Sequence, residues 1–245
     1  MSRVRVCGSR LFKRYLLDGS AETALARADW LSGNAVLTPG GVLARHGRLA
    51  EFAMIPGAPG RSVVDSQSRS IEPMLFRPIV RMHALRPGLP LPRFDPLAKI
   101  VPRLDNWTAA KLQGEMANAL DVIDSFDCSN VVIHGDLHAG QFVIDETGSA
   151  WLLDLDDLSE GDPAADIGNF AAHLATRDES GRKNPNAFMS AWLHVVLLAY
   201  GQAGGRVSPA LAAAYGQLAL IRRALKFRER GKSDLLAALC GRRAD

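Results

Sequence analysis

The sequence predicts an α+β protein, with short strands in its first quarter and helices in most of the remainder. Short apolar runs punctuated by glycine and proline occupy the first 56 residues, which is typical of strands and tight turns. Apolar residues recur at helical spacing between residues 108 and 228. Between these helices, residues 131–166 combine a buried strand, a polar loop and a hairpin, so the chain should be organised around this central stretch.

Composition limits the class of protein. The chain has 245 residues, of which 47% are hydrophobic and 22% charged, as in globular proteins with a sizeable core. The net charge of +3 is too small to indicate a nucleic-acid partner. Three widely spaced cysteines suggest neither disulfides nor zinc, and we find no secretory h-region and no apolar segment long enough for a bilayer. We therefore expect a cytoplasmic protein without a membrane partner; the oligomeric state is left open.

The first elements in chain order are strands and one helix. Residues 3–17 predict a hairpin that turns at Gly8-Ser9, with Lys13 near the end of its second strand. Ser20 is a suitable N-cap for the helix that follows. Residues 36–44 form the next strand region, and residues 49–55 form another strand that ends at Pro56-Gly57.

Helices and a proline-rich loop lead to the central stretch. Residues 72–85 predict a helix, in which His83 is interpreted as a packed structural histidine. Residues 86–102 are rich in proline and predict an irregular surface loop. Residues 108–126 predict a helix from the spacing of their apolar side chains.

The central stretch places acids at one edge. Residues 131–133 form a strand that leads into His134-Gly135-Asp136, and residues 142–145 and 150–153 form a hairpin. The hairpin returns Asp154 to the side of Asp136, and Gln141 adds an amide. Carboxylate and amide oxygens suit Mg²⁺, and phosphoryl transfer depends mainly on positioning and charge neutralisation.

The last third is predicted to be helical. Asp162 is an N-cap followed by Pro163 at the first helical position, which starts a helix over residues 164–176. Residues 187–203 and 208–228 predict two further helices, whose apolar faces belong to the core. From residue 177 onward there are 12 Lys or Arg against 5 Asp or Glu, a bias that usually marks a solvated face and that could attract an anionic partner.

The central stretch resembles the catalytic core of the aminoglycoside phosphotransferase and choline kinase group, relatives of protein kinases. The signature of that group is H-G-D-x-x-x-x-N, a hairpin, I-D-x-[DEG] and G-D-P-x-x-D. The chain matches it with these residues: His134, Gly135, Asp136, Asp154, Asp156, Gly161, Asp162, Pro163 and Asp166. It departs at Gln141, which carries the amide of the usual asparagine on a longer stem.

The resemblance implies a two-lobed, protein-kinase-like fold. Residues 1–56 would form a small and incomplete antiparallel-sheet lobe that binds nucleotide, and residues 57–245 a larger, mostly helical lobe for catalysis and substrate. The family's glycine-containing loop over the ATP phosphates has no counterpart, because no G-x-G-x-x-G precedes Lys13. Residues 56–62 do not fit a P-loop either.

The implied activity is ATP- and Mg²⁺-dependent transfer of the γ-phosphoryl group to a hydroxyl of a small molecule. In the resemblance, Asp136 orients the hydroxyl and accepts its proton, and Lys13 holds the phosphates with Glu22 as its partner. Gln141 and Asp154 hold Mg²⁺, and Asp156 supports or joins the metal site. His134 and Asp166 support the catalytic loop. The acceptor is not identified by the sequence. The basic final third disfavours polycationic aminoglycosides.

Two other functions compete with this one. A pseudokinase that binds without turnover is suggested by the absent glycine loop and by Gln141. A metal-dependent phosphohydrolase could use His134, Asp136, His138, Asp154 and Asp156, although its further histidine motifs are absent. For single residues, Lys13 could be a surface lysine on an edge strand, and Glu22 could be an exposed glutamate near a helix N-terminus.

Overall fold

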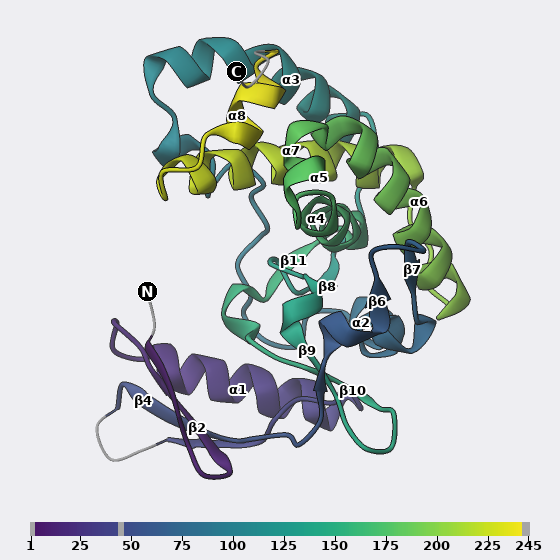
Figure 1. The fold of residues 1–245 in the computed structure, drawn as a ribbon. Helices are drawn as coiled ribbons and strands as arrows, with labels where there is room; N and C mark the ends of the chain where they lie inside the picture. The colour runs from purple at the N-terminus through teal and green to yellow at the C-terminus, as the bar shows by residue number, and fades with distance from the viewer. Residues whose placement is uncertain (1–2, 44–46, 242–245) are drawn as a thin grey trace.

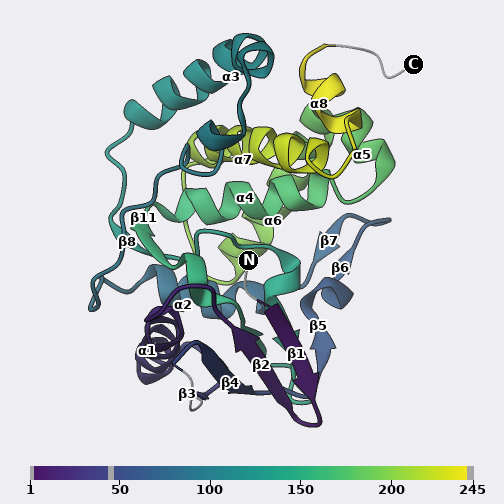
Figure 2. The same ribbon diagram turned by 90° about the vertical axis from the view of Figure 1, so that its left-hand side faces the viewer.

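The computed structural model describes residues 3–43 and 47–241, which fold into two lobes (Figure 1). The small lobe holds a four-stranded sheet and one long helix, and the large lobe holds the remaining helices with several short β-ladders. Figure 2 shows the same division after a quarter turn. The predicted α+β, kinase-like architecture is confirmed, whereas the lobe boundary at residue 56 stays a prediction.

The small lobe is an antiparallel sheet in the order β1-β2-β4-β3, against which helix α1 packs. The bounds of its elements are β1 Arg3–Cys7, β2 Arg10–Arg14, α1 Ser20–Gly33, β3 Gly41–Leu43 and β4 Leu49–Ala53. The predicted hairpin is therefore confirmed, with Val4 opposite Lys13. The predicted N-cap is wrong by one residue, because Gly19 takes that position with φ 78° and Ser20 is the first helical residue.

Three predicted elements are shorter than expected. Only residues 41–43 of the predicted 36–44 strand are in a ladder; Ala44 lies outside the described residues. The predicted 49–55 strand ends at Ala53. The predicted 72–85 helix is a 3-10 turn over Pro73–Phe76 followed by α2, Arg77–His83. Pro78 lacks the N–H that a continuous helix would need there, so the chain starts a new helix instead.

The large lobe consists of helices joined to short ladders. Its helices after α2 are α3 Asn106–Asp124, α4 Pro163–Ala175, α5 Glu179–Lys183, α6 Pro185–Gln202, α7 Pro209–Arg228 and α8 Asp234–Leu239. Its strands are β5 Ala58–Pro59, β6 Val64–Asp65, β7 Ser70–Ile71, β8 Val131–Ile133, β9 Phe142–Ile144, β10 Ala150–Leu152 and β11 Ser159–Gly161. Among the described residues, no helix is both long and apolar enough to cross a membrane.

Local chemistry fixes the ends of the predicted helices. Asp162 caps α4 by accepting from the amide of Ala164 at 2.8 Å, as predicted. Helix α3 starts two residues earlier than predicted, because Asp105 and Thr108 form a reciprocal capping box. The short elements α5, α8, β5–β7 and β11 were not predicted, since they lack the length for a recognisable period.

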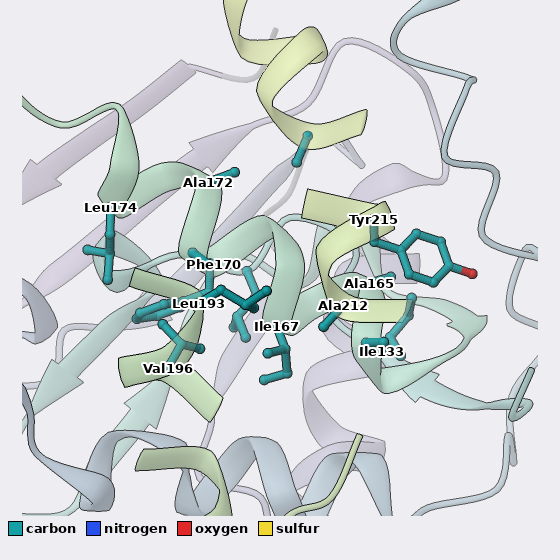
Figure 3. Close-up of a cluster of buried hydrophobic side chains, with 14 of the residues drawn as sticks. Ile133, Ala165, Ile167, Phe170, Ala172, Leu174, Leu193, Val196, Ala212 and Tyr215 are labelled. Atoms are coloured by element: carbon teal, nitrogen blue, oxygen red, sulfur yellow. The ribbon is translucent and has the colours of Figure 1, made fainter. Parts of the chain in front are cut away.

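Helix α4 lies at the centre of the large lobe and is covered by α6 and α7 (Figure 3). Its buried side chains include Phe170, whose ring lies 5.0 Å from that of Phe76. Gly168 allows α7 to approach closely, since a Cβ there would lie 2.4 Å from the carbonyl oxygen of Ala212. This tight contact fixes α7 against α4.

The central stretch forms the predicted strand and hairpin. Strand β8 pairs with β11, and β9 pairs with β10 so that Ile144 lies opposite Ala150. The other edge of β9 pairs with β5, which belongs to the connection between the lobes. The hairpin therefore joins the lobe connection on one side and delivers Asp154 on the other.

Candidate active site

A cavity of about 440 Å³ lies between the two lobes. Its walls combine side chains of the small-lobe sheet and α1 with those of the β9–β10 hairpin. Most of the lining is apolar, and the polar members are Lys13, Tyr15, Gln141, Asp154 and Asp156. A concave apolar site with a few convergent polar groups is the usual form of a small-ligand pocket.

Lys13 bridges the lobes at this cavity. Its Nζ lies 2.5 Å from Oδ1 of Asp154 and 2.7 Å from Oδ2 of Asp156, and its side chain is only 9% exposed. Burial opposes the charge of Lys13, but the hydrogen bonds and charges of the two acids outweigh it and raise the pKa of the lysine. Tyr15 adds a hydroxyl that donates to Asp156 at 3.2 Å. Lys13 is thus a charged group inside the cavity, and its interpretation as a surface lysine is wrong.

Glu22 does not reach this cluster. It is exposed on α1, and no hydrogen bond or ion pair within residues 3–43 and 47–241 joins it to Lys13. The partners of Lys13 are Asp154 and Asp156 instead. The assignment of Glu22 as the partner of Lys13 is therefore corrected, because Glu22 lies on the exposed face of α1, away from the buried face that packs on the lobe.

Helix α1 contributes Arg27 to the site, a residue that the sequence analysis missed. Its Nη1 donates to the carbonyl oxygens of Leu155 at 3.1 Å and of Asp156 at 2.6 Å. These bonds hold the segment after Asp154 against the small lobe. A cation, and not the expected carboxylate, is thus what α1 presents here.

Asp154 ends the hairpin with an unusual backbone conformation. Its φ of 56° lies in the left-handed region, which turns the chain sharply and aims the side chain at Lys13. Gln141 donates its Nε2 to Oδ2 of Asp154 at 3.4 Å. Burial acts to raise the pKa of Asp154, but the hydrogen bond and charge of Lys13 prevail, and the pKa is lowered.

The donor set suits a hard cation. Asp154 and Asp156 present carboxylate oxygens around one point, and Gln141 lies on the same side. No group of three His, Cys, Asp or Glu in the described part of the chain could hold a metal unaided. Mg²⁺ is usually bound in proteins by one or two carboxylates together with substrate phosphates. Gln141 would have to turn its amide so that Oε1 faces the ion.

Asp136 lies in the loop after β8 and pairs with Arg222 of α7. Nη2 of Arg222 is 2.7 Å from Oδ1 of Asp136 and 2.7 Å from Oδ1 of Asn169. Burial would raise the pKa of Asp136, but the charges of Arg222 and Lys99 outweigh it and lower the pKa. Asp136 is therefore an ionised, half-buried carboxylate with 27% side-chain exposure.

Asp166 braces the loop that carries Asp136. Its two oxygens accept from the backbone amides of His134 at 2.7 Å and of Gly135 at 2.9 Å. Nε2 of His83 lies 3.1 Å from the same carboxylate, and Nδ1 of His83 is 2.8 Å from the Tyr200 hydroxyl. Since the carboxylate can only accept, Nε2 of His83 is the donor in this contact.

Two further features fix the same loop. His134 is fully buried, with its Nε2 2.9 Å from the carbonyl oxygen of Leu153 in the hairpin. Gly135 has φ 76°, and a Cβ there would lie 2.3 Å from the carbonyl oxygen of Asp157. The loop is thus held by α4, the hairpin and the segment after it.

The structure therefore brings most of the predicted residues into two neighbouring groups. One group is Lys13, Gln141, Asp154 and Asp156, and the other is Asp136 on the loop supported by His134 and Asp166. The partner of Asp136 was missed, although Arg222-Arg223 interrupts an otherwise apolar helix after Ile221. That interruption was the only signal in the sequence.

Residues 7–224 match the family model described as "Phosphotransferase enzyme family". This match covers both lobes and every residue of the two groups. The chain belongs to that family. Membership in this family indicates that the protein is a small-molecule phosphotransferase of the kinase type. A search of curated proteins finds no match.

Solved structures of kinases share the fold of this phosphotransferase-family chain. The choline kinase LicA from Streptococcus pneumoniae has a TM-score of 0.63 and 16% identity, over 98% of this chain and 88% of that one. The aminoglycoside phosphotransferase APH(3'')-Id from Streptomyces rimosus, in complex with ADP and streptomycin, has a TM-score of 0.58 and 20% identity over 86% of each chain. Amicoumacin kinase hAmiN, in complex with AMP-PNP, Ca²⁺ and Ami, has a TM-score of 0.62 and 14% identity, over 92% and 79%. At these identities the likeness establishes the fold.

The amide of Gln141 provides a first test of whether Mg²⁺ binds at this donor set. We expect Gln141→Leu to raise the Mg²⁺ concentration for half-maximal ATP turnover about tenfold, because one oxygen donor is lost. Gln141→Asn keeps the amide and should stay within roughly threefold of wild type. A Mg²⁺ titration of ATP consumption measures both. Equal Mg²⁺ requirements of the leucine variant and wild type would exclude a metal contact at residue 141.

Proposed function

We propose that the protein is an ATP- and Mg²⁺-dependent kinase that phosphorylates a hydroxyl of a small molecule. The observation that carries the proposal is the placement of Lys13, Asp154 and Asp156 around one point of the cavity between the lobes. Family membership and an ionised carboxylate at Asp136 on a braced loop add support. A cavity of about 440 Å³ is within the range of small-ligand pockets.

The residues divide the work of phosphoryl transfer. The apolar lining of the cavity would hold the base of the nucleotide, and Lys13 would pair with its phosphates once they replace the carboxylates as its partners. Asp136 would accept a hydrogen bond from the acceptor hydroxyl and then its proton. The acceptor oxygen forms a bond to the γ-phosphorus while the bond from that phosphorus to the β–γ bridging oxygen breaks, and ADP leaves with the electron pair.

Asp154, Asp156 and the turned amide of Gln141 are the residues that would hold Mg²⁺. When bound, the ion would neutralise charge on the phosphate oxygens. Arg27 has a supporting part, because its bonds to the carbonyl oxygens of Leu155 and Asp156 keep this segment in place. Precise positioning of this kind is the main source of catalysis in phosphoryl transfer.

Thermal unfolding tests the proposal without knowledge of the acceptor. A ligand that binds only the folded state stabilises it by RT ln(1 + [L]/Kd), about 2.7 kcal/mol at a hundredfold excess over Kd. We expect ATP with Mg²⁺ to raise Tm by roughly 5–10 °C in a chain of this size. ATP with a chelator should raise it much less, and Asp154→Ala should remove the difference between the two conditions.

Asp124→Asn is the matched control, because this exposed acid at the end of α3 contacts neither group. Its Tm shifts should equal those of wild type. A wild-type protein that is indifferent to ATP with and without Mg²⁺ would refute the kinase proposal. Stabilisation by Mg²⁺ and ATP without turnover of any acceptor would instead favour a pseudokinase, the second candidate, in which the pairing of Asp136 with Arg222 is permanent.

A further inference from the structure

Helix α7 presents a cluster of three cations to Asp136, which we call the α7 cationic cluster: Arg222, Arg223 and Lys226. Arg222 contacts Asp136 directly. Burial lowers the pKa of Arg223 and of Lys226, and the charge of Asp136 partly opposes that lowering. All three cations are therefore within electrostatic reach of Asp136. Residues 222 and 226 lie one helical turn apart, so they share a face of α7.

The cluster has more positive charge than its partners neutralise. Arg223 donates its Nε to the hydroxyl of Thr176 at 2.6 Å, and no carboxylate in the described ranges pairs with it. Lys226 is exposed, and among the described residues it has no hydrogen bond or ion pair. Arg222 uses one atom, Nη2, for both Asp136 and Asn169, which leaves the donors on Nε and Nη1 for another acceptor.

Three cations around this cluster each pair with a carboxylate. Lys99 pairs with Asp157 at 2.6 Å, Arg228 with Asp105 at 2.8 Å and Arg103 with Glu229 at 3.1 Å. Arg223 and Lys226 differ from these three cations, because no carboxylate in the described ranges pairs with either. Arg230, just beyond α7, also lacks such a partner, and its charge acts on both. The helix dipole acts within the last turn, which includes Lys226. Arg222 and Arg223 precede that turn, so the dipole does not account for these two arginines.

The α7 cationic cluster is energetically unfavourable as it stands, which supports a role in binding an anion. Burial and the charge of Arg222 lower the pKa of Arg223 to about 10. Burial and the same cations hold the pKa of His173 well below its usual value, and His173 stacks on His138 at 4.4 Å. A partly buried cation without an acid partner is unfavourable unless an anion completes the site.

We propose that the acceptor carries an anionic group, a phosphate or a carboxylate, which Arg223 and Lys226 bind while the acceptor hydroxyl lies at Asp136. The same anion would meet the free donors of Arg222. This inference rests on the proposed kinase function and adds the substrate class. It also separates this chain from the structural neighbours described above, since choline and streptomycin are cations.

Acceptor-dependent release of ADP from Mg²⁺ and ATP tests the substrate class. The acceptors are matched sets: glycerol, glycerate and glycerol 3-phosphate, then glucose, gluconate and glucose 6-phosphate, with choline and streptomycin as cationic members. We expect at least one anionic member to exceed its neutral counterpart about tenfold or more in kcat/KM, and the carboxylate and phosphate arms to identify the anion. Activity confined to neutral or cationic acceptors would overturn the inference and leave the kinase proposal intact.

A binding measurement keeps the test independent of turnover. Inorganic phosphate and the six acid or neutral compounds are titrated by calorimetry against wild type, Arg223→Gln and Lys226→Gln. We expect anions to bind wild type and both variants to weaken that binding about tenfold or more, with the ATP affinity unchanged. Lys226→Gln removes an exposed side chain without contacts, so it remains informative if Arg223→Gln fails to fold.

Arg206→Gln is the charge-matched control. Arg206 is exposed and precedes α7, whose first residue lies about 21 Å along the helix axis from residue 223. The Arg206→Gln variant should bind anions with the same affinity as wild type. Anion binding that is equal in wild type and in both cluster variants, or that the Arg206 variant weakens as strongly, would overturn the inference. Absent ATP binding together with cluster-dependent anion binding would instead remove the kinase proposal alone.

Discussion

Asp136→Asn should lower kcat by about 10²–10⁴-fold while leaving the affinity for ATP within roughly twofold of wild type. The amide can still accept a hydrogen bond from Arg222, so the loop should stay folded, but it cannot take the proton of the acceptor hydroxyl. Steady-state kinetics with the best acceptor and a nucleotide titration measure the two quantities separately. Retained turnover with every acceptor would remove Asp136 from the reaction.

The pH dependence follows from the lowered pKa of Asp136. Arg222 and Lys99 hold that pKa below its usual value of 3.8, so the carboxylate is the ionised base throughout neutral and mildly acidic pH. As pH falls, the loss of kcat that belongs to Asp136 should begin only below about pH 4. An acid limb centred near pH 6 would show that another group is the base. Asp124→Asn again serves as the control for a neutralised surface acid.

Asp166→Ala should reduce the free energy of unfolding by roughly 3–5 kcal/mol, the largest loss of stability that we expect in this chain. Its carboxylate is only 1% exposed and accepts from the amides of His134 and Gly135 as well as from His83. Removal leaves these buried donors without an acceptor. Urea unfolding followed by circular dichroism gives the change in midpoint and slope.

Asp178 provides a comparison between the buried contacts of Asp166 and an ordinary helix cap. Asp178 is exposed and caps α5 through one backbone amide at 2.7 Å, so Asp178→Ala should cost about 1 kcal/mol. Asp166→Asn retains one acceptor oxygen, so its loss in the free energy of unfolding should lie between those of Asp166→Ala and Asp178→Ala. Equal losses for Asp166→Ala and Asp178→Ala would mean that water replaces the brace and that the loop does not depend on it.

The sequence predicts the positions of those residues whose placement follows from local structure. Strand β8, the β9–β10 hairpin and the Asp162 cap are all encoded within a few residues, so they fix Asp136, Asp154 and Asp166 together. Lys13 was placed by the alternation of a short hairpin. The family motif added roles to these positions, and those roles stay predictions.

The remaining contacts depend on packing between distant segments. Arg222 meets Asp136 only because Gly168 lets α7 approach α4, and no local pattern encodes that distance. Arg27 and Glu22 lie on one helix, and only the rotation of α1 against the hairpin decides that Arg27 reaches the site. The orientation of Gln141 is likewise set by its bond to Asp154 across the hairpin.

The pairing of β5 with β9 has a mechanical consequence. Strand β5 closely follows the predicted lobe boundary at residue 56, and β9 begins directly after Gln141. A swinging motion of the small lobe would therefore pull on the hairpin that carries Gln141 and Asp154. Opening and closing should then proceed by sliding of packed surfaces and not as a free hinge. Under the proposed kinase function, exchange of nucleotide would then be coupled to rearrangement of Gln141 and Asp154 in a single movement.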